Sequence, residues 1–144
     1  MSQRISRAQF EQRLAELCVD SGSMEFPHRD SDRHILWKSI IVGLEPAVHY
    51  LEEEIDEHIQ HCLTTIGRTT NRDHVNIRRQ LVDVGYLIRT QDGSVYQHAA
   101  TGPSRERFDV DVENVNCDAV IQKRQALRAQ KSQDFFKTHF QQEE

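Results

Sequence analysis

The spacing of apolar residues near the start of the chain predicts a helix over residues 6 to 18. Its buried face should hold Phe10, Leu14 and Leu17, which recur at helical intervals. Ser6 and Gln9, three positions apart, have the residue types of a capping box at the helix N-terminus. We therefore expect residues 1 to 25 to form an N-terminal helical extension.

A second helix is expected to begin near Ser31 or Asp32, since either side chain can cap a helix N-terminus. Apolar residues then repeat every fourth position up to Leu44. Pro46 prevents the helix from continuing because it lacks a backbone N–H and clashes with the preceding turn.

Residues 47 to 50 read as a short extended segment, and a third helix follows it. This helix has one continuous apolar stripe, made of Leu51, Ile55, Ile59, Cys62, Leu63 and Ile66. Asp73 is expected to cap or open a fourth helix that ends near Gly85. On this fourth helix Ile77, Leu81 and Val84 cluster on one side.

Residues 86 to 97 contain two runs of β-prone residues joined by Asp92-Gly93. This pair predicts a hairpin with a type I′ turn, because Gly93 tolerates a positive φ. The order helix, short strand, helix, helix, hairpin is that of a winged helix. We therefore expect an α+β, mostly α protein with a winged-helix domain over residues 26–97 and extra helices at both ends.

Residues 98–144 are expected to add a loop, a strand and a helix. Residues 101 to 104 have loop composition, and Phe108, Val110 and Val112 alternate with acidic residues as in a half-buried strand. A long helix should run from Asp118 to about His139. It can either fold back on the core or pair with a second chain, and we expect a homodimer through the terminal helices.

The composition places the chain among polar, non-membrane proteins. Of its 144 residues 37% are hydrophobic, and the mean hydropathy is −0.70, so the core should be modest. No apolar run is long enough to cross a bilayer, and the first residues lack the apolar core of a secretory signal. Three scattered cysteines, Cys18, Cys62 and Cys117, favour reduced thiols. We expect a cytoplasmic location.

Charge is unevenly distributed along the chain, whose net charge is −5. Residues 45 to 66 hold six acidic residues and no lysine or arginine. Residues 67 to 89 hold five arginines against two aspartates. The net charge argues against nucleic-acid binding, whereas the local excess of arginine permits it.

The fourth helix is the candidate DNA-recognition element. Its outward face and flanks carry long donors that suit base edges and phosphates: Arg68, Arg72, Asn76, Arg79, Gln80 and Arg89. The competing interpretation is an ordinary solvated face. Two features favour that alternative, since the hairpin tip from Thr90 to Ser94 has no basic residue and the third helix places acidic side chains nearby.

Arg78 lies at the edge of the apolar side of the same helix, where its stem can cover apolar surface. We expect it to be structural and to form an ion pair with Asp83 or with the acidic third helix, through Glu52, Glu54 or Asp56. The set Arg78, Asp83 and Glu54 is the predicted structural ion-pair group.

No pattern indicates catalysis or a cofactor. The chain has no glycine-rich phosphate loop, serine nucleophile elbow or His-Glu-x-x-His run. Glu54, His58 and Cys62 have a spacing that can present metal ligands on one helix face. Apolar neighbours surround Cys62, so a core thiol is the simpler interpretation. We expect no enzyme activity, no metal and no cofactor.

Several motifs resemble the prokaryotic family called domain of unknown function 2087. They are Phe26-Pro27 with Arg33, the segment from Tyr50 to Asp56, and the run from Asp73 to Tyr96 that contains Arg78-Arg79-x-Leu81-Val82-Asp83 and Asp92-Gly93. The chain departs from the family pattern at Leu51, where a capping Thr is usual, and at His58, a usually apolar position. The resemblance implies a setting in transcription control, because members occur alone or fused to helix-turn-helix repressor-type domains.

The sequence thus predicts a winged-helix module that binds duplex DNA and is associated with transcription regulation. The alternative is an interaction or ligand-sensing domain that keeps the winged-helix shape without binding DNA.

Overall fold

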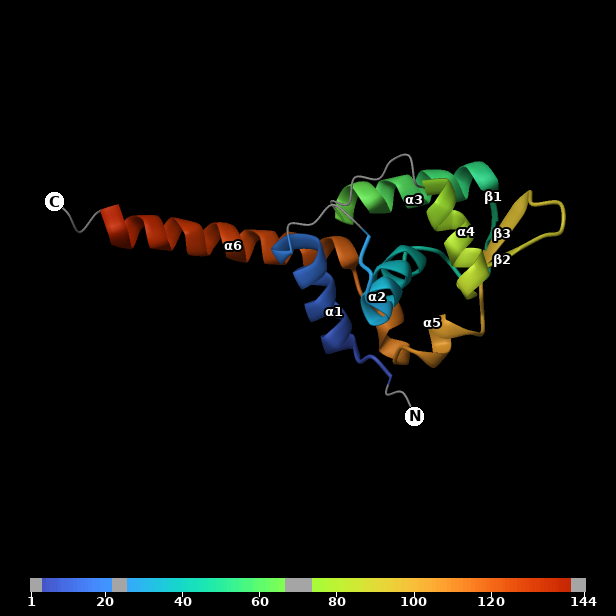
Figure 1. Ribbon diagram of the computed structural model, residues 1–144, viewed down its shortest axis with the longest axis horizontal. Helices are drawn as coiled ribbons and strands as arrows, with labels where there is room; N and C mark the ends of the chain where they lie inside the picture. Colours follow the sequence, from blue (N-terminus) through green and yellow to red (C-terminus); the bar gives the residue numbers. More distant parts are fainter. Residues whose placement is uncertain (1–3, 22–25, 67–73, 141–144) are drawn as a thin grey trace.

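The protein is described by a computed structural model that covers residues 4–21, 26–66 and 74–140. It is mostly helical, with one small antiparallel sheet at one end of the body and a long helix that projects from the other end (Figure 1). The predicted α+β, mostly α class is confirmed. Within the described part of the chain, none of the helices has the length and apolar character needed to cross a bilayer.

The central part of the chain has the element order of a winged helix. The elements are α2 (Asp30–Ile41), β1 (His49–Leu51), α3 (Glu52–Ile66), α4 (His74–Val84), β2 (Leu87–Arg89) and β3 (Val95–His98). The strands lie in the order β1-β3-β2, and every neighbouring pair is antiparallel. Tyr50 of β1 pairs with Tyr96 of β3, so β1 joins the sheet beside the hairpin.

The N-terminal helix α1 (Arg7–Ala15) begins with the predicted capping box. The Ser6 hydroxyl accepts from the Gln9 N–H at 3.1 Å, and the Gln9 side chain accepts from the Ser6 N–H at 2.9 Å. Helix α1 continues as a π-helical segment, η1 (Glu16–Asp20). Phe10 and Leu14 are completely buried, as their spacing predicted.

Helix α2 begins at Asp30, one to two residues earlier than expected, and the predicted cap by Ser31 or Asp32 is wrong. Arg29 occupies the capping position and its side chain makes no capping bond. Asp32 lies inside the first turn and is buried, where its two carboxylate oxygens accept from Arg13 at 2.8 Å each. This bidentate pair joins α1 to α2, which explains why Asp32 is not available as a cap.

The end of α4 and the tip of the hairpin both depend on glycine. Gly85 has a φ of 103°, and the Tyr86 N–H bonds the Leu81 carbonyl at 2.7 Å, which ends α4 in the Schellman pattern. Gly93 has a φ of 75°, but Asp92 does not have the positive φ that a type I′ turn requires. The expected turn type is therefore wrong, and Gln91 to Ser94 form a longer loop closed by Thr90 and Val95.

The strand expected at Phe108, Val110 and Val112 is absent. Phe108 makes one isolated parallel bridge with Ile5, and residues Val110–Asn114 form the 3-10 helix η3. Phe108 and Val112 are buried while Val110 is 72% exposed, so the three do not share a face. The four-residue spacing of Phe108 and Val112 fits a helical turn as well as a strand, and the segment forms a helical turn.

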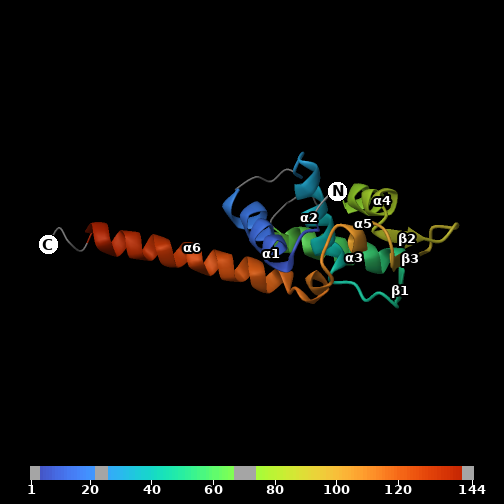
Figure 2. The same cartoon turned by 90° about the horizontal axis from the view of Figure 1, so that it is seen from below.

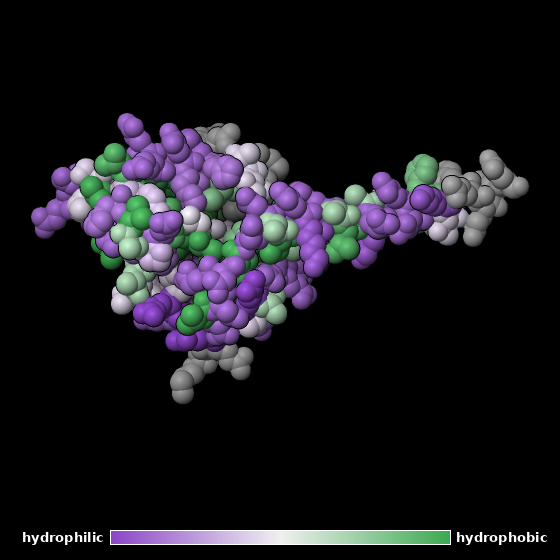
Figure 3. Space-filling model, turned by 180° about the vertical axis from the view of Figure 1, so that it is seen from behind, coloured by the Kyte–Doolittle hydropathy of each residue, from purple (hydrophilic) through white to green (hydrophobic). Residues whose placement is uncertain are grey.

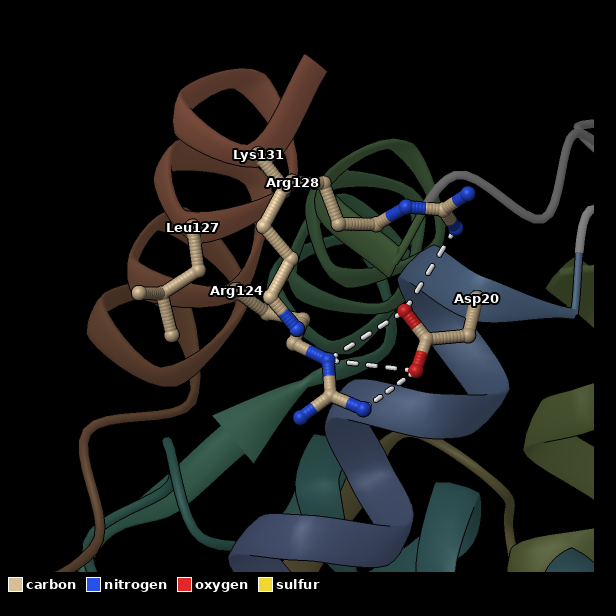
Figure 4. A pocket seen from close by; sticks show the side chains of 5 residues that line it. All are labelled: Asp20, Arg124, Leu127, Arg128 and Lys131. Carbon is tan, nitrogen blue, oxygen red and sulfur yellow. Dashed lines mark hydrogen bonds and ion pairs between the residues drawn. The ribbon is translucent and has the colours of Figure 1, made fainter. Parts of the chain in front are cut away.

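The remaining elements are the short helix α5 (Pro103–Glu106), in a region expected to be a loop, and the long helix α6 (Cys117–Phe140). The first turns of α6 pack on α1 through buried Ile121. Farther along, Arg124 and Arg128 both bind the Asp20 carboxylate at the end of η1 (Figure 4). The rest of α6 extends away from the body, and its surface is mostly hydrophilic (Figures 1, 2 and 3).

The segments on either side of the winged helix complete its core. The Phe10 and Phe108 rings lie 5.9 Å apart between centroids and cover α2. Lys38 of α2 is fully buried, and its ammonium donates to the Ser104 hydroxyl at 2.6 Å, to the Ser104 carbonyl at 3.1 Å and to Glu113 at 2.5 Å. The interior of the winged helix is therefore closed partly by residues that follow it in the chain.

Candidate nucleic-acid interface

Helix α4 has two faces of opposite character. Ile77 and Leu81, one helical turn apart, are buried against the rest of the body, and α3 is its main neighbour. The other face holds Asn76, Arg79 and Asp83, which are all exposed. The amphipathic pattern therefore leaves the face with Asn76, Arg79 and Asp83 as the side of α4 that can contact a ligand.

Arg79 is the main cationic group on this outward face. Its guanidinium has no ion pair or hydrogen bond to any described residue. Asn76, three residues earlier and on the same face, is exposed and likewise has no side-chain hydrogen bond within the described ranges. Both side chains keep their donors available, as contact with base edges or phosphates requires.

Gln80 differs from its two neighbours because part of its side chain is engaged. Its side-chain oxygen accepts from the indole N–H of Trp37 at 3.2 Å, which joins α4 to α2. Gln80 is therefore half-buried and acts first as a packing residue. Its amide nitrogen is the part of the side chain that remains for an outside contact.

The three other predicted DNA contacts are distributed differently. Arg89 of β2 is exposed and lies opposite Tyr96 in the sheet register. Arg68 and Arg72 lie outside the described residues. The structure therefore brings Asn76, Arg79 and Gln80 together on one helix, with Arg89 on the neighbouring hairpin.

Arg78 points away from this outward face and is held in an acidic site. Its guanidinium donates to Asp56 at 2.5 Å and lies 3.0 Å from Glu52, and only 12% of its side chain is exposed. It also lies over the ring of Tyr96, 5.8 Å from the centroid. Burial lowers the pKa of Arg78, but the hydrogen bond to Asp56 and the nearby negative charges outweigh it, so the net shift is upward.

The partners of Arg78 are thus Glu52 and Asp56, two of the three acids of α3 that were expected, while Glu54 and Asp83 are not among them. Glu54 instead accepts from the Leu51 N–H at 2.9 Å at the start of α3, and Asp83 is exposed. Helical spacing separates these alternatives, because Glu52 and Asp56 are four residues apart and share a face of α3 that Glu54 does not.

Two features weigh against DNA binding: the acidic residues of α3 and the lack of a basic residue at the hairpin tip. Arg78 pairs with both Glu52 and Asp56, so its single positive charge offsets only one of their two negative charges. Glu53, Glu54 and Glu57 are further exposed acids in the first turns of α3. At the hairpin tip, bonds from Thr90 and from both the hydroxyl and the backbone N–H of Ser94 lower the pKa of Asp92 to about 2. The tip therefore carries a negative charge, which repels phosphate.

The metal-like spacing on α3 does not assemble a ligand group. His58 bonds the Ile40 carbonyl at 2.7 Å, and Cys62 lies 3.5 Å from the same ring nitrogen. Burial raises the pKa of the Cys62 thiol to about 12, which disfavours the thiolate that binds metal. Across the described ranges, no three histidine, cysteine or acidic residues are placed to hold a metal ion.

The outward face of α4 is not covered by the C-terminal helix. Two perpendicular views place α4 beside the hairpin at one end of the body, while α6 leaves from the other end (Figures 1 and 2). The described C-terminal segment thus leaves Asn76 and Arg79 open to solvent.

A family model described as "Uncharacterized protein conserved in bacteria (DUF2087)" matches residues 24–98, just over half of the chain. The chain belongs to the DUF2087 family. The matched DUF2087 residues include the whole of the winged helix and Arg78 with both its acidic partners. The resemblance stated from the sequence is confirmed. No curated protein and no solved structure matches the chain.

Proposed function

We propose that this protein is a non-catalytic, DNA-binding winged-helix module associated with transcription regulation, and that α4 is its recognition helix. The observation that supports this most is the pair Asn76 and Arg79, exposed on the outward face of α4 and not engaged by the acidic residues of α3. Winged helices present this helix to the major groove, where Arg suits guanine and Asn suits adenine.

The charge of the hairpin tip indicates how such a module would approach a duplex. Because Asp92 is ionised there, the hairpin should stay clear of the phosphates. Arg89, the exposed last residue of β2, is the positively charged hairpin residue that can supply a phosphate contact. We thus propose docking through α4 with a minor contribution from the hairpin.

The test is fluorescence anisotropy of a labelled duplex titrated with the protein at several salt concentrations. A few phosphate contacts should weaken binding steeply between about 50 and 200 mM salt. Arg79→Ala should weaken binding by about 1–3 kcal/mol if Arg79 makes a bidentate base contact. Lys123→Ala, which removes one positive charge from the exposed surface of α6, is the matched control and should bind like the wild type.

Two outcomes would contradict the proposal. One is the absence of binding at low salt. The other is equal weakening by Arg79→Ala and Lys123→Ala, which would show a diffuse response to net charge rather than a recognition helix.

We also propose that the protein acts as a homodimer through α6. Leu127, Phe135 and Phe136 are 47%, 59% and 62% exposed on a helix whose distal half lies away from the body. The part of α6 that lies away from the body is a short helical segment, and such segments are marginally stable in water without packing contacts. Light scattering should give a dimer that is lost when Phe135 and Phe136 are both changed to Ser, and a monomer at high protein concentration would overturn this proposal.

A further inference from the structure

A pocket of about 510 Å³ lies where the winged helix meets the segment that follows it. The exit of α2, the end of β3, α5 and η3 all contribute to its lining. Most of the lining is apolar, and the apolar residues are Val42, Leu44, Pro46, Ala99 and Ala100. Its size lies within the range of small-molecule sites in proteins.

His98 gives this pocket an unusual polar group. It is only 6% exposed, it lines the pocket, and neither of its ring nitrogens has a hydrogen-bond partner among the described residues. Buried polar groups in folded proteins nearly always have partners, so an unpartnered ring beside a pocket points to a ligand that supplies one. Burial lowers the pKa of His98, so the ring is neutral near pH 7 and offers one donor and one acceptor.

The pocket is lined by one positively charged and one negatively charged side chain that have no ion-pair partner among the described residues. Glu113 is already paired with buried Lys38. Arg105 and Glu45, both exposed, line the pocket without an ion pair to each other or to any other residue that the structure describes. One unpaired cation and one unpaired anion therefore face the same apolar space.

We propose that this pocket binds a free amino acid with an apolar side chain. The guanidinium of Arg105 pairs with the carboxylate of the ligand, and Glu45 pairs with its ammonium group. The apolar wall covers the side chain, and a small shift of the ring lets His98 bond the polar end. A ligand of only one charge would leave either Arg105 or Glu45 unmatched. This inference does not depend on DNA binding.

The experiment measures the melting temperature of the full chain with increasing L-leucine, L-phenylalanine or L-tryptophan, followed by calorimetry with the strongest of them. A ligand that binds the folded state raises the melting temperature progressively with its concentration. Phenylpropanoate, which lacks the ammonium, and phenethylamine, which lacks the carboxylate, are the matched analogues of L-phenylalanine. Each should bind about tenfold more weakly than L-phenylalanine, because one charged hydrogen bond is lost.

The variants Arg105→Gln and Glu45→Gln should each weaken binding by about tenfold for the same reason. Both residues are exposed, so the fold should survive the changes. Lys123→Gln and Glu106→Gln remove the same charges outside the pocket and should bind like the wild type. His98→Leu, which fills the position with an apolar side chain and removes both ring nitrogens, should also weaken binding.

Three results would overturn the proposal. The first is that none of the three amino acids raises the melting temperature. The second is that phenylpropanoate or phenethylamine binds as tightly as L-phenylalanine, which would mean that the pocket takes a singly charged molecule. The third is unchanged affinity in Arg105→Gln and Glu45→Gln. Loss of DNA binding in Arg79→Ala would not affect any of these three results, because Arg79 does not line the pocket.

Discussion

The guanidinium of Arg78 donates to the carboxylate of Asp56 at 2.5 Å, whereas the next side chain in sequence, Arg79, is directed into solvent. Two adjacent arginines on α4 therefore have opposite environments. One is held in the acidic surface of α3, and the other is available to a ligand. Their different environments allow stability and binding to be tested with two variants of equal charge.

Arg78→Ala should lower the free energy of unfolding by about 1–3 kcal/mol, because two half-exposed carboxylates lose their partner and Tyr96 loses a covering group. Arg79→Ala should change it by less than about 0.5 kcal/mol, as is usual for an exposed residue. Urea denaturation of both variants measures the difference. Equal losses would mean that the two side chains do not differ in burial as described.

Glu113→Gln should destabilise the protein more than the double variant Lys38→Met, Glu113→Gln. Burial lowers the pKa of Lys38, although the hydrogen bond to Glu113 opposes that shift, so the ammonium depends on its carboxylate. Removing the carboxylate alone leaves a buried charge, at a cost of about 1–3 kcal/mol after allowance for the half-exposed Glu113. Chemical denaturation of the three proteins is the measurement, and a double variant less stable than Glu113→Gln would contradict the expectation.

Stability should decline as the pH falls below about 6.5, the ordinary pKa of histidine. Burial lowers the pKa of His98 and of His34 in the folded state, so the unfolded chain binds more protons at acidic pH. Each such histidine can contribute up to about 1.4 kcal/mol per pH unit within that window. The contribution is complete above the unfolded pKa and is lost as the pH falls towards the folded one.

Urea midpoints between pH 7.5 and 5.5 test this expectation against His98→Gln. The variant should show a shallower decline than the wild type, with His34 accounting for part of what remains. An identical pH slope in both proteins would mean that His98 does not titrate on unfolding. The charge of Glu113 raises the pKa of His98 and that of Lys38 lowers it, and Glu113→Gln tests the influence of the carboxylate.

In dilute protein, where the proposed dimer is dissociated, shortening the chain after Lys131 should leave the unfolding free energy within about 0.5 kcal/mol of the full-length value, because residues 132–138 are exposed. Ending it instead at Asn116 also removes Ile121, and loss of this large buried side chain should cost about 2–5 kcal/mol. The Arg124–Asp20 pair is lost as well, but it lies at the surface and should add little. Thermal unfolding followed by circular dichroism distinguishes the two truncations. A large loss on ending at Lys131 would indicate that the distal part of α6 packs against something in solution.

The elements that could be predicted from the sequence are those with a strong local signal. The capping box at Ser6, the apolar stripe of α3 and the Asp92-Gly93 hairpin are each specified within a few residues. The start of α2 was not, because it depends on a tertiary contact. The type of turn at Asp92 was not either, and there Asp92 accepts hydrogen bonds from Thr90 and Ser94. Asp32 looks like a cap until Arg13 is brought to it from α1.

The sequence predicts the outward face of α4, but it predicts neither the contact of Gln80 nor the pocket. The periodicity of α4 assigns Asn76 and Arg79 to its outward face, where the structure places them. It cannot show that Gln80 reaches Trp37, which is 43 residues earlier. The pocket beside His98 carries no sequence signal, since its lining comes from segments between Val42 and Glu113.

The amine of Lys38 also bears on how relatives of this chain are compared. It belongs to the matched region, yet every group that satisfies it lies beyond residue 98. A family member that has only the matched region would lack both the groups that bind this amine and part of the surface that covers it. A buried lysine at this position should therefore occur together with a serine and an acid farther along the chain.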